Sequence, residues 1–140
     1  MNDIEYETQK ARVQALADKW LLPLGLKYWM VSLDFDRTTH VEKDENAADN
    51  WAEVACCRVR WEYLQANMVW RLLVVEDLSD EQLERHFIHE CMHVFLNEMR
   101  ETDENMKHEE RVAELLANAF WWVHTTMTDR DVHPPVATAL

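Results

Sequence analysis

Five consecutive residues, His89-Glu90-Cys91-Met92-His93, follow the pattern H-E-x-x-H. In a helix the two histidines lie one turn apart and about 40° apart around the axis, so their imidazoles can converge on one metal ion. Glu90 lies close to the same face, too far round to share the ion readily but near enough to reach a water molecule bound there. Cys91, two residues after His89, is expected to point to the opposite side of the helix.

These residue types suit zinc chemistry. Two neutral imidazole nitrogens can hold Zn²⁺, and the ion lowers the pKa of a bound water toward ~7. The Glu90 carboxylate can take a proton from that water and pass it to a leaving group, so we predict that Glu90 is the general base and then the acid. The alternative is that His89 and His93 are ordinary helix residues and that Glu90 is solvated. The apolar flanks and the capped start of the predicted helix favour the zinc interpretation.

A catalytic zinc site usually has three protein ligands, and the third should come from another element. The later predicted helix offers Glu109, Glu110 and Glu114. We favour Glu110, because Ala113 and Ala117 follow it on the same face and small residues let two helices approach closely. Glu114, one turn further on, is placed to orient a ligand histidine.

The rival third ligand is Glu109, which heads a second stripe made of Val112, Leu116 and Ala119. Leu116 also flanks the alanine stripe, together with Phe120, and both side chains are predicted to pack into the core. His108, Glu114 and a residue outside this helix are the remaining alternatives for the third position.

The order of predicted elements is one helix, three strands and two helices, which is an α+β arrangement with a mixed or antiparallel three-stranded sheet. Ser79 and Gln82 have the spacing of a capping box at the start of the first of the two later helices. We expect one domain over residues 1–128 and an irregular tail over 129–140, with loops at 36–50 and 100–107. The predicted helices are 3–20, 80–99 and 108–127, and the predicted strands are 27–35, 52–62 and 67–75.

The composition limits the classes of partner and the compartment. The formal net charge of −13 disfavours nucleic acid, since Lys and Arg form no basic patch. The chain has three cysteines, Cys56, Cys57 and Cys91. An odd number of cysteines indicates a reducing compartment rather than a disulfide framework. The acidic, polar start is unlike a signal peptide, and no stretch of 18 apolar residues predicts a membrane span. We therefore expect a cytoplasmic protein.

The motif and the glutamate-bearing helix together resemble the minimal zincins of the gluzincin type, many of which are small bacterial or phage-encoded metallopeptidases. In the phage-repressor-cleaving metallopeptidases, the third ligand begins an E-x-x-A-x-x-F-A pattern. Glu110, Ala113, Leu116 and Ala117 match that pattern, with Leu in place of Phe. Residues 66–81 also resemble the strand and helix start that precede the motif in that family, where the strand borders the substrate cleft.

The resemblance implies a zincin-like fold, one Zn²⁺ and hydrolysis of peptide bonds in a peptide or protein substrate, and it specifies no oligomeric state. Cys91 and Met92 are unusual between the two histidines, and no third histidine follows at the metzincin spacing. His108, His124 and Tyr63 are candidates by type alone for stabilising the transition state. The alternative function is a non-catalytic phage or bacterial regulatory protein that keeps a zinc site.

Overall fold

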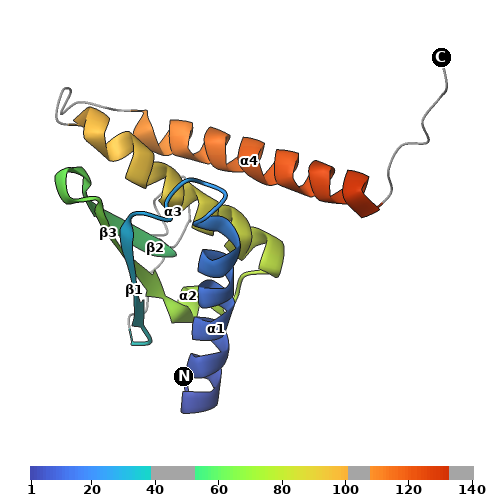
Figure 1. The fold of residues 1–140 in the computed structure, drawn as a ribbon. Coiled ribbons are helices and arrows are strands. Elements are labelled where there is room, and N and C mark those ends of the chain that lie inside the picture. The colour runs from blue at the N-terminus through green and yellow to red at the C-terminus, as the bar shows by residue number, and fades with distance from the viewer. Residues whose placement is uncertain (39–52, 101–107, 133–140) are drawn as a thin grey trace.

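The computed structural model describes residues 1–38, 53–100 and 108–132. Over these ranges the chain forms four α-helices, a short 3₁₀ helix and one three-stranded sheet, so the predicted α+β class is confirmed (Figure 1). The elements in chain order are α1 (Asp3–Trp20), β1 (Met30–Asp36), β2 (Ala55–Arg60), η1 (Trp61–Tyr63), β3 (Gln65–Arg71), α2 (Leu72–Val75), α3 (Asp80–Arg100) and α4 (Glu109–Val132).

The strands predicted over 27–35 and 52–62 are shorter in the structure, as Met30–Asp36 and Ala55–Arg60, and two other element boundaries differ by four residues or more. The strand predicted over 67–75 is wrong in its second half, because β3 ends at Arg71 and residues 72–75 form the helical turn α2. Leu72 and Val75 are fully buried there, and a short, fully buried apolar run has no periodicity that separates strand from helix. Helix α4 continues to Val132, so residues 129–132 are helical rather than irregular. Residues 39–52, 101–107 and 133–140, which hold most of the predicted loops and tail, lie outside the described residues.

The sheet is mixed, with strand order β1-β3-β2. β1 runs parallel to the central strand β3, and β2 runs antiparallel to it and forms an edge. Every second residue of β3 is buried, namely Ala66, Met68 and Trp70, because successive strand side chains point to opposite faces. The Trp70 ring stacks on Phe87 of α3, with centroids 5.6 Å apart, so the core lies between the sheet and α3.

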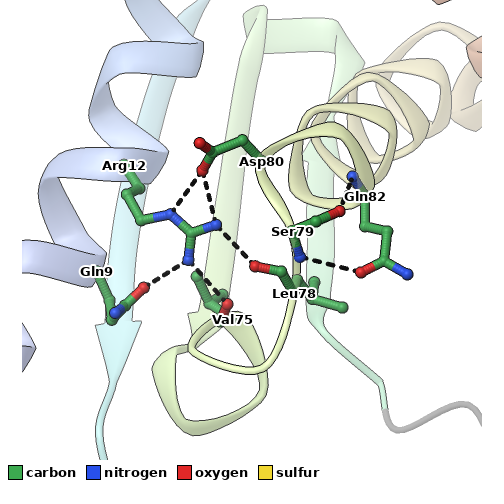
Figure 2. Close-up of polar contacts among 7 residues, drawn as sticks. All are labelled: Gln9, Arg12, Val75, Leu78, Ser79, Asp80 and Gln82. Atoms are coloured by element: carbon green, nitrogen blue, oxygen red, sulfur yellow. Dashed lines mark hydrogen bonds and ion pairs between the residues drawn. The ribbon is translucent and has the colours of Figure 1, made fainter.

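The start of α3 is fixed by a capping box, as the sequence predicts. Ser79 Oγ accepts from the Gln82 amide at 3.2 Å, and Gln82 Oε1 accepts from the Ser79 amide at 3.0 Å (Figure 2). This reciprocal pair satisfies two amides that the helix itself cannot satisfy. The cap sets the first residue of α3, and with it the face on which the H-E-x-x-H residues lie.

Arg12 of α1 ties the segment before α3 to the first helix (Figure 2). Its guanidinium donates to the carbonyl oxygens of Val75 and Leu78 at 3.1 and 2.8 Å. It also donates twice to Asp80 and once to Gln9. A guanidinium with five donors is suited to bind several oxygens at once, so one side chain holds α1, α2 and the start of α3 together.

Replacing Arg12 by Met should lower the free energy of unfolding by about 2 kcal/mol, because the carbonyls it satisfies lose their charged donor. Urea unfolding followed by tryptophan fluorescence measures the change. Arg37→Met is the matched control, since the described contacts of Arg37 are an ion pair with the largely exposed Asp3 and a cation–π contact with Tyr6, and its loss should change stability by less than about 1 kcal/mol. Equal losses in both variants would contradict this role for Arg12.

Candidate metal centre

Helix α4 packs closely along α3 through small side chains. Ala113 and Ala117 are 0% and 1% exposed, as predicted for the stripe that follows Glu110. Further along, Asn118 Oδ1 accepts two hydrogen bonds from Arg85 of α3, at 3.0 and 2.6 Å. The expectation that Leu116 and Phe120 pack into the core is wrong, since they are 37% and 43% exposed. They flank the alanine face, about 60° and 20° round the helix axis from Ala113, and are only partly covered there.

His89 and His93 converge on one point at this helix pair. Their Nε2 atoms lie 3.1 Å apart. The two carboxylate oxygens of Glu110 face one nitrogen each, with Oε2 at 3.1 Å from His89 Nε2 and Oε1 at 3.0 Å from His93 Nε2. The histidine side chains are 12% and 11% exposed, whereas Glu110 is 76% exposed and closes the cluster from the solvent side. The structure therefore brings together the three residues predicted as metal ligands.

The opposite nitrogen of each imidazole faces a different glutamate of α4. His89 Nδ1 lies 2.9 Å from Glu114 Oε2, the orienting contact that the sequence predicts for Glu114. His93 Nδ1 lies 3.4 Å from Glu109 Oε1, which is longer than a well-formed hydrogen bond. Glu109, the rival ligand, is therefore buried beside the outer nitrogen of His93 rather than at the point of convergence.

The positions of these glutamates bear on which nitrogen of each imidazole carries the proton. A neutral imidazole that carries its proton on Nδ1, toward a carboxylate, has a lone pair on Nε2. If His89 and His93 both do so, two lone pairs and two carboxylate oxygens face one another at 3.0–3.1 Å. Such a cluster is stable only with positive charge at its centre, supplied either by protons or by a metal ion. Neighbouring ligand atoms in a tetrahedral zinc site are roughly 3.3 Å apart, close to these distances.

Glu90 lies next to this cluster and is 7% exposed. One ligand atom each of His89, Glu90 and His93 lie within 4.8 Å of one another. Burial, with smaller contributions from the charges of Glu110 and Glu53, raises the pKa of Glu90 to about 8. A divalent cation between the imidazoles would oppose this shift, because it favours the charged carboxylate.

A cleft of about 960 Å³ runs between α3, the start of α4 and β2, and the two histidines lie on its wall. The consecutive residues 53–57 all line it. Successive strand side chains point to opposite faces, so this continuous lining indicates that the main-chain edge of β2 borders the cleft. The expectation that the strand before α3 borders the cleft is wrong, because β3 is the central strand and β2 is the edge.

The other residues singled out from the sequence lie elsewhere. Cys91 is fully buried in the core, and burial raises the pKa of its thiol. Tyr63 is 69% exposed in η1, and the ring of His124 packs on Trp20 with centroids 4.6 Å apart. His108 is exposed at the residue before α4.

His86, which was not among the residues predicted for the site, lines the cleft one turn before His89. Burial lowers the pKa of His86, and the charge of Glu114 opposes that shift. The spacing H-x-x-H-E-x-x-H, with a third histidine on the same helical face, is the signal that could have identified it. His86 adds an uncharged, hydrogen-bonding group to the wall beside the histidine pair.

Comparison of the chain with protein-family models, with curated proteins and with solved structures found no match. Over the ranges that the structure describes, no helix has the length and apolar character that crossing a lipid bilayer requires. The interpretation of the site therefore depends on its own geometry and chemistry.

If Glu110 is the third ligand, Glu110→Gln should weaken zinc binding by about 100-fold, because it removes the charged oxygen at the centre of the cluster. Glu114→Gln should weaken it by about 10-fold or more through the orientation of His89. Glu98→Gln, an exposed change on α3, is the matched control and should leave the affinity unchanged. Isothermal titration of the chelator-treated protein with ZnCl₂ measures all three. A larger loss in Glu109→Gln than in Glu110→Gln would assign the ligand to Glu109 instead.

Proposed function

We propose that this protein is a zinc-dependent metallohydrolase with a zincin-like arrangement, and that it cleaves peptide bonds. The proposal depends on the convergence of two imidazole nitrogens and one carboxylate from two helices. The Nε2 atoms of His89 and His93 and the carboxylate of Glu110 meet at 3.0–3.1 Å, beside a buried glutamate and within a cleft.

The donor set fits zinc. Two imidazole nitrogens and one carboxylate oxygen are a common ligand combination of catalytic zinc sites, in which the fourth position is open to water. When bound, zinc acts as a Lewis acid that polarises a carbonyl group and lowers the pKa of water. Glu114 Oε2 lies 2.9 Å from His89 Nδ1 and can hold that imidazole from behind, and Glu109 lies 3.4 Å from His93 Nδ1 on the corresponding outer side.

Glu90 is suited to move protons rather than to hold the ion. It adjoins His89 in the sequence, lies within 4.8 Å of the ligand nitrogens and is almost fully buried. In the proposed reaction its carboxylate accepts a proton from the attacking water and then donates that proton to the amine that leaves. Burial keeps this carboxylate away from bulk water, so its pKa responds strongly to the charge beside it.

The shape of the cleft supports a peptide as the substrate. An edge strand has unpaired amide and carbonyl groups along its outer side, and an extended peptide can pair with them. β2 presents such an edge along the cleft that contains the two histidines. A peptide bound there would have its backbone held in register while one of its carbonyl groups lies at the metal centre.

The direct test is Glu90→Gln, which keeps the size of the side chain and removes its ability to accept a proton. Hydrolysis of casein and of a quenched-fluorescence peptide library by the zinc-loaded protein should fall by at least about 100-fold. Zinc content and melting temperature should stay close to those of the wild type.

Glu98→Gln serves as the matched control and should retain full activity. The competing function is a non-catalytic regulatory protein with a structural zinc site. That function is favoured if the wild type binds zinc but cleaves nothing in the library above the level of Glu90→Gln. Absence of zinc binding at micromolar zinc would remove the support for both.

A further inference from the structure

The middle of α4, residues 115–128, has an unusual sequence for an exposed helix. No Asp, Glu, Lys or Arg occurs between Glu114 and Asp129, although 29% of the whole chain is charged. One side of this segment packs against α3 and α1, through Ala117, Trp121 and His124. The other side of a surface helix normally carries charged residues, and here it carries apolar ones.

We call this other side the α4 stripe. Its six large apolar side chains expose between 37% and 63% of their surfaces, and they are Leu115, Leu116, Phe120, Trp122, Val123 and Met127. At 100° per residue they fall within an arc of about 160°, which begins about 20° from Ala113 at Phe120 and extends to the face opposite the alanines at Trp122. Figure 1 shows α4 on the outer side of α3, with its C-terminal end extending beyond the start of α3. The described part of the chain therefore leaves this face uncovered.

We propose that the α4 stripe is the interface through which two copies of this chain form a symmetric dimer. Leu116, Phe120, Val123 and Met127 are spaced by four, three and four residues, which is the seam spacing of helices that pack side by side. A twofold axis across the stripe places the same apolar seam on both partners, so the surface is complementary to itself.

The exposed area of the α4 stripe is consistent with binding a second copy of the chain. Six half-exposed large side chains present on the order of 600 Å², at the upper end of the largest apolar patches on monomeric proteins. A stable interface buries roughly 800 Å² on each partner, and the backbone and Ala119 between these side chains add to the stripe. The stripe is therefore large enough to form most of a dimer interface.

Charge disfavours the other occupants of this face. The net charge of −13 makes two copies repel one another over long range, and that repulsion is least where the contact surface itself has no charge, as along the stripe. A strongly basic partner would gain nothing from this uncharged face. A helix that binds an anionic lipid surface needs Lys or Arg beside its apolar face, and the segment between Glu114 and Asp129 has neither.

The dimer would leave the metal centre accessible. The residues of α4 that line the cleft are Glu109, Glu110, Arg111 and Glu114, all of which precede the stripe in the sequence. Pairing through the stripe therefore covers a different part of the helix, and the inference holds whether or not the protein binds zinc.

Sedimentation-velocity ultracentrifugation of the full chain, from low micromolar to several hundred micromolar, tests the proposal. The wild type should sediment as a species of about twice the chain mass of 16.7 kDa. The double variant Trp122→Glu/Val123→Glu should weaken self-association by at least about 100-fold, because dimerisation would then bury four uncompensated charges. Added NaCl should strengthen the wild-type dimer by screening the like charges of the two copies.

The matched control is Ile4→Glu/Leu22→Glu, which adds the same charge at two exposed apolar residues (80% and 63% exposed) away from α4 and should keep the dimer. Circular dichroism checks that each variant is folded. If the glutamate pair unfolds the chain, Phe120→Gln/Val123→Gln, both on the seam, replaces it, with the same expected loss of dimer. A wild type that is monomeric throughout overturns the proposal, whether or not it binds lipid vesicles or another protein. A folded stripe variant that remains dimeric overturns it equally.

Discussion

Two imidazole nitrogens that face each other at 3.1 Å, with a carboxylate across both, need a positive charge between them. This requirement organises the surrounding structure. Glu114 Oε2 and Glu109 Oε1 lie 2.9 and 3.4 Å from the outer nitrogens of the rings, and a proton held on each outer nitrogen would direct the lone pairs to the centre. Protons or a metal ion can satisfy the cluster, and the ligand set of two histidines and one glutamate favours zinc. In the proposed function the buried Glu90 beside it would move the proton, because its charge depends on the cation.

The cluster exists because two helices are held in one register. Ala113 and Ala117 let the backbone of α4 approach α3, and the bonds from Arg85 to Asn118 fix the position of one helix along the other. The capping box at Ser79 and the five bonds of Arg12 fix where α3 begins relative to α1 and the sheet. The precision of the site therefore comes from contacts some distance from it, and a site on two rigid helices is better ordered than one on loops.

Local patterns were sufficient to predict α1, the cap of α3 and the faces of His89, His93 and Glu110, because helix periodicity and capping act over four residues or fewer. The other features depend on contacts between residues that are distant in the sequence, and local patterns do not predict such contacts. Residues 72–75 resemble a strand by composition but form α2, since their burial between elements decides their structure. The order of the strands, and thus the strand that borders the cleft, depends on pairing between distant segments. Leu116 and Phe120 are apolar at positions that suit a core, and only the placement of α4 reveals that they are exposed.

The most direct test of the account is an anomalous-difference map at the zinc absorption edge, from crystals of the zinc-loaded protein. The account predicts one strong peak at ~2.0–2.1 Å from Nε2 of both His89 and His93 and within about 2.2 Å of a Glu110 oxygen. The carboxylate of Glu90 should lie outside bonding distance of that peak. A map with no peak between the two imidazoles, or with the ion held by Glu109 or by a cysteine, would contradict it.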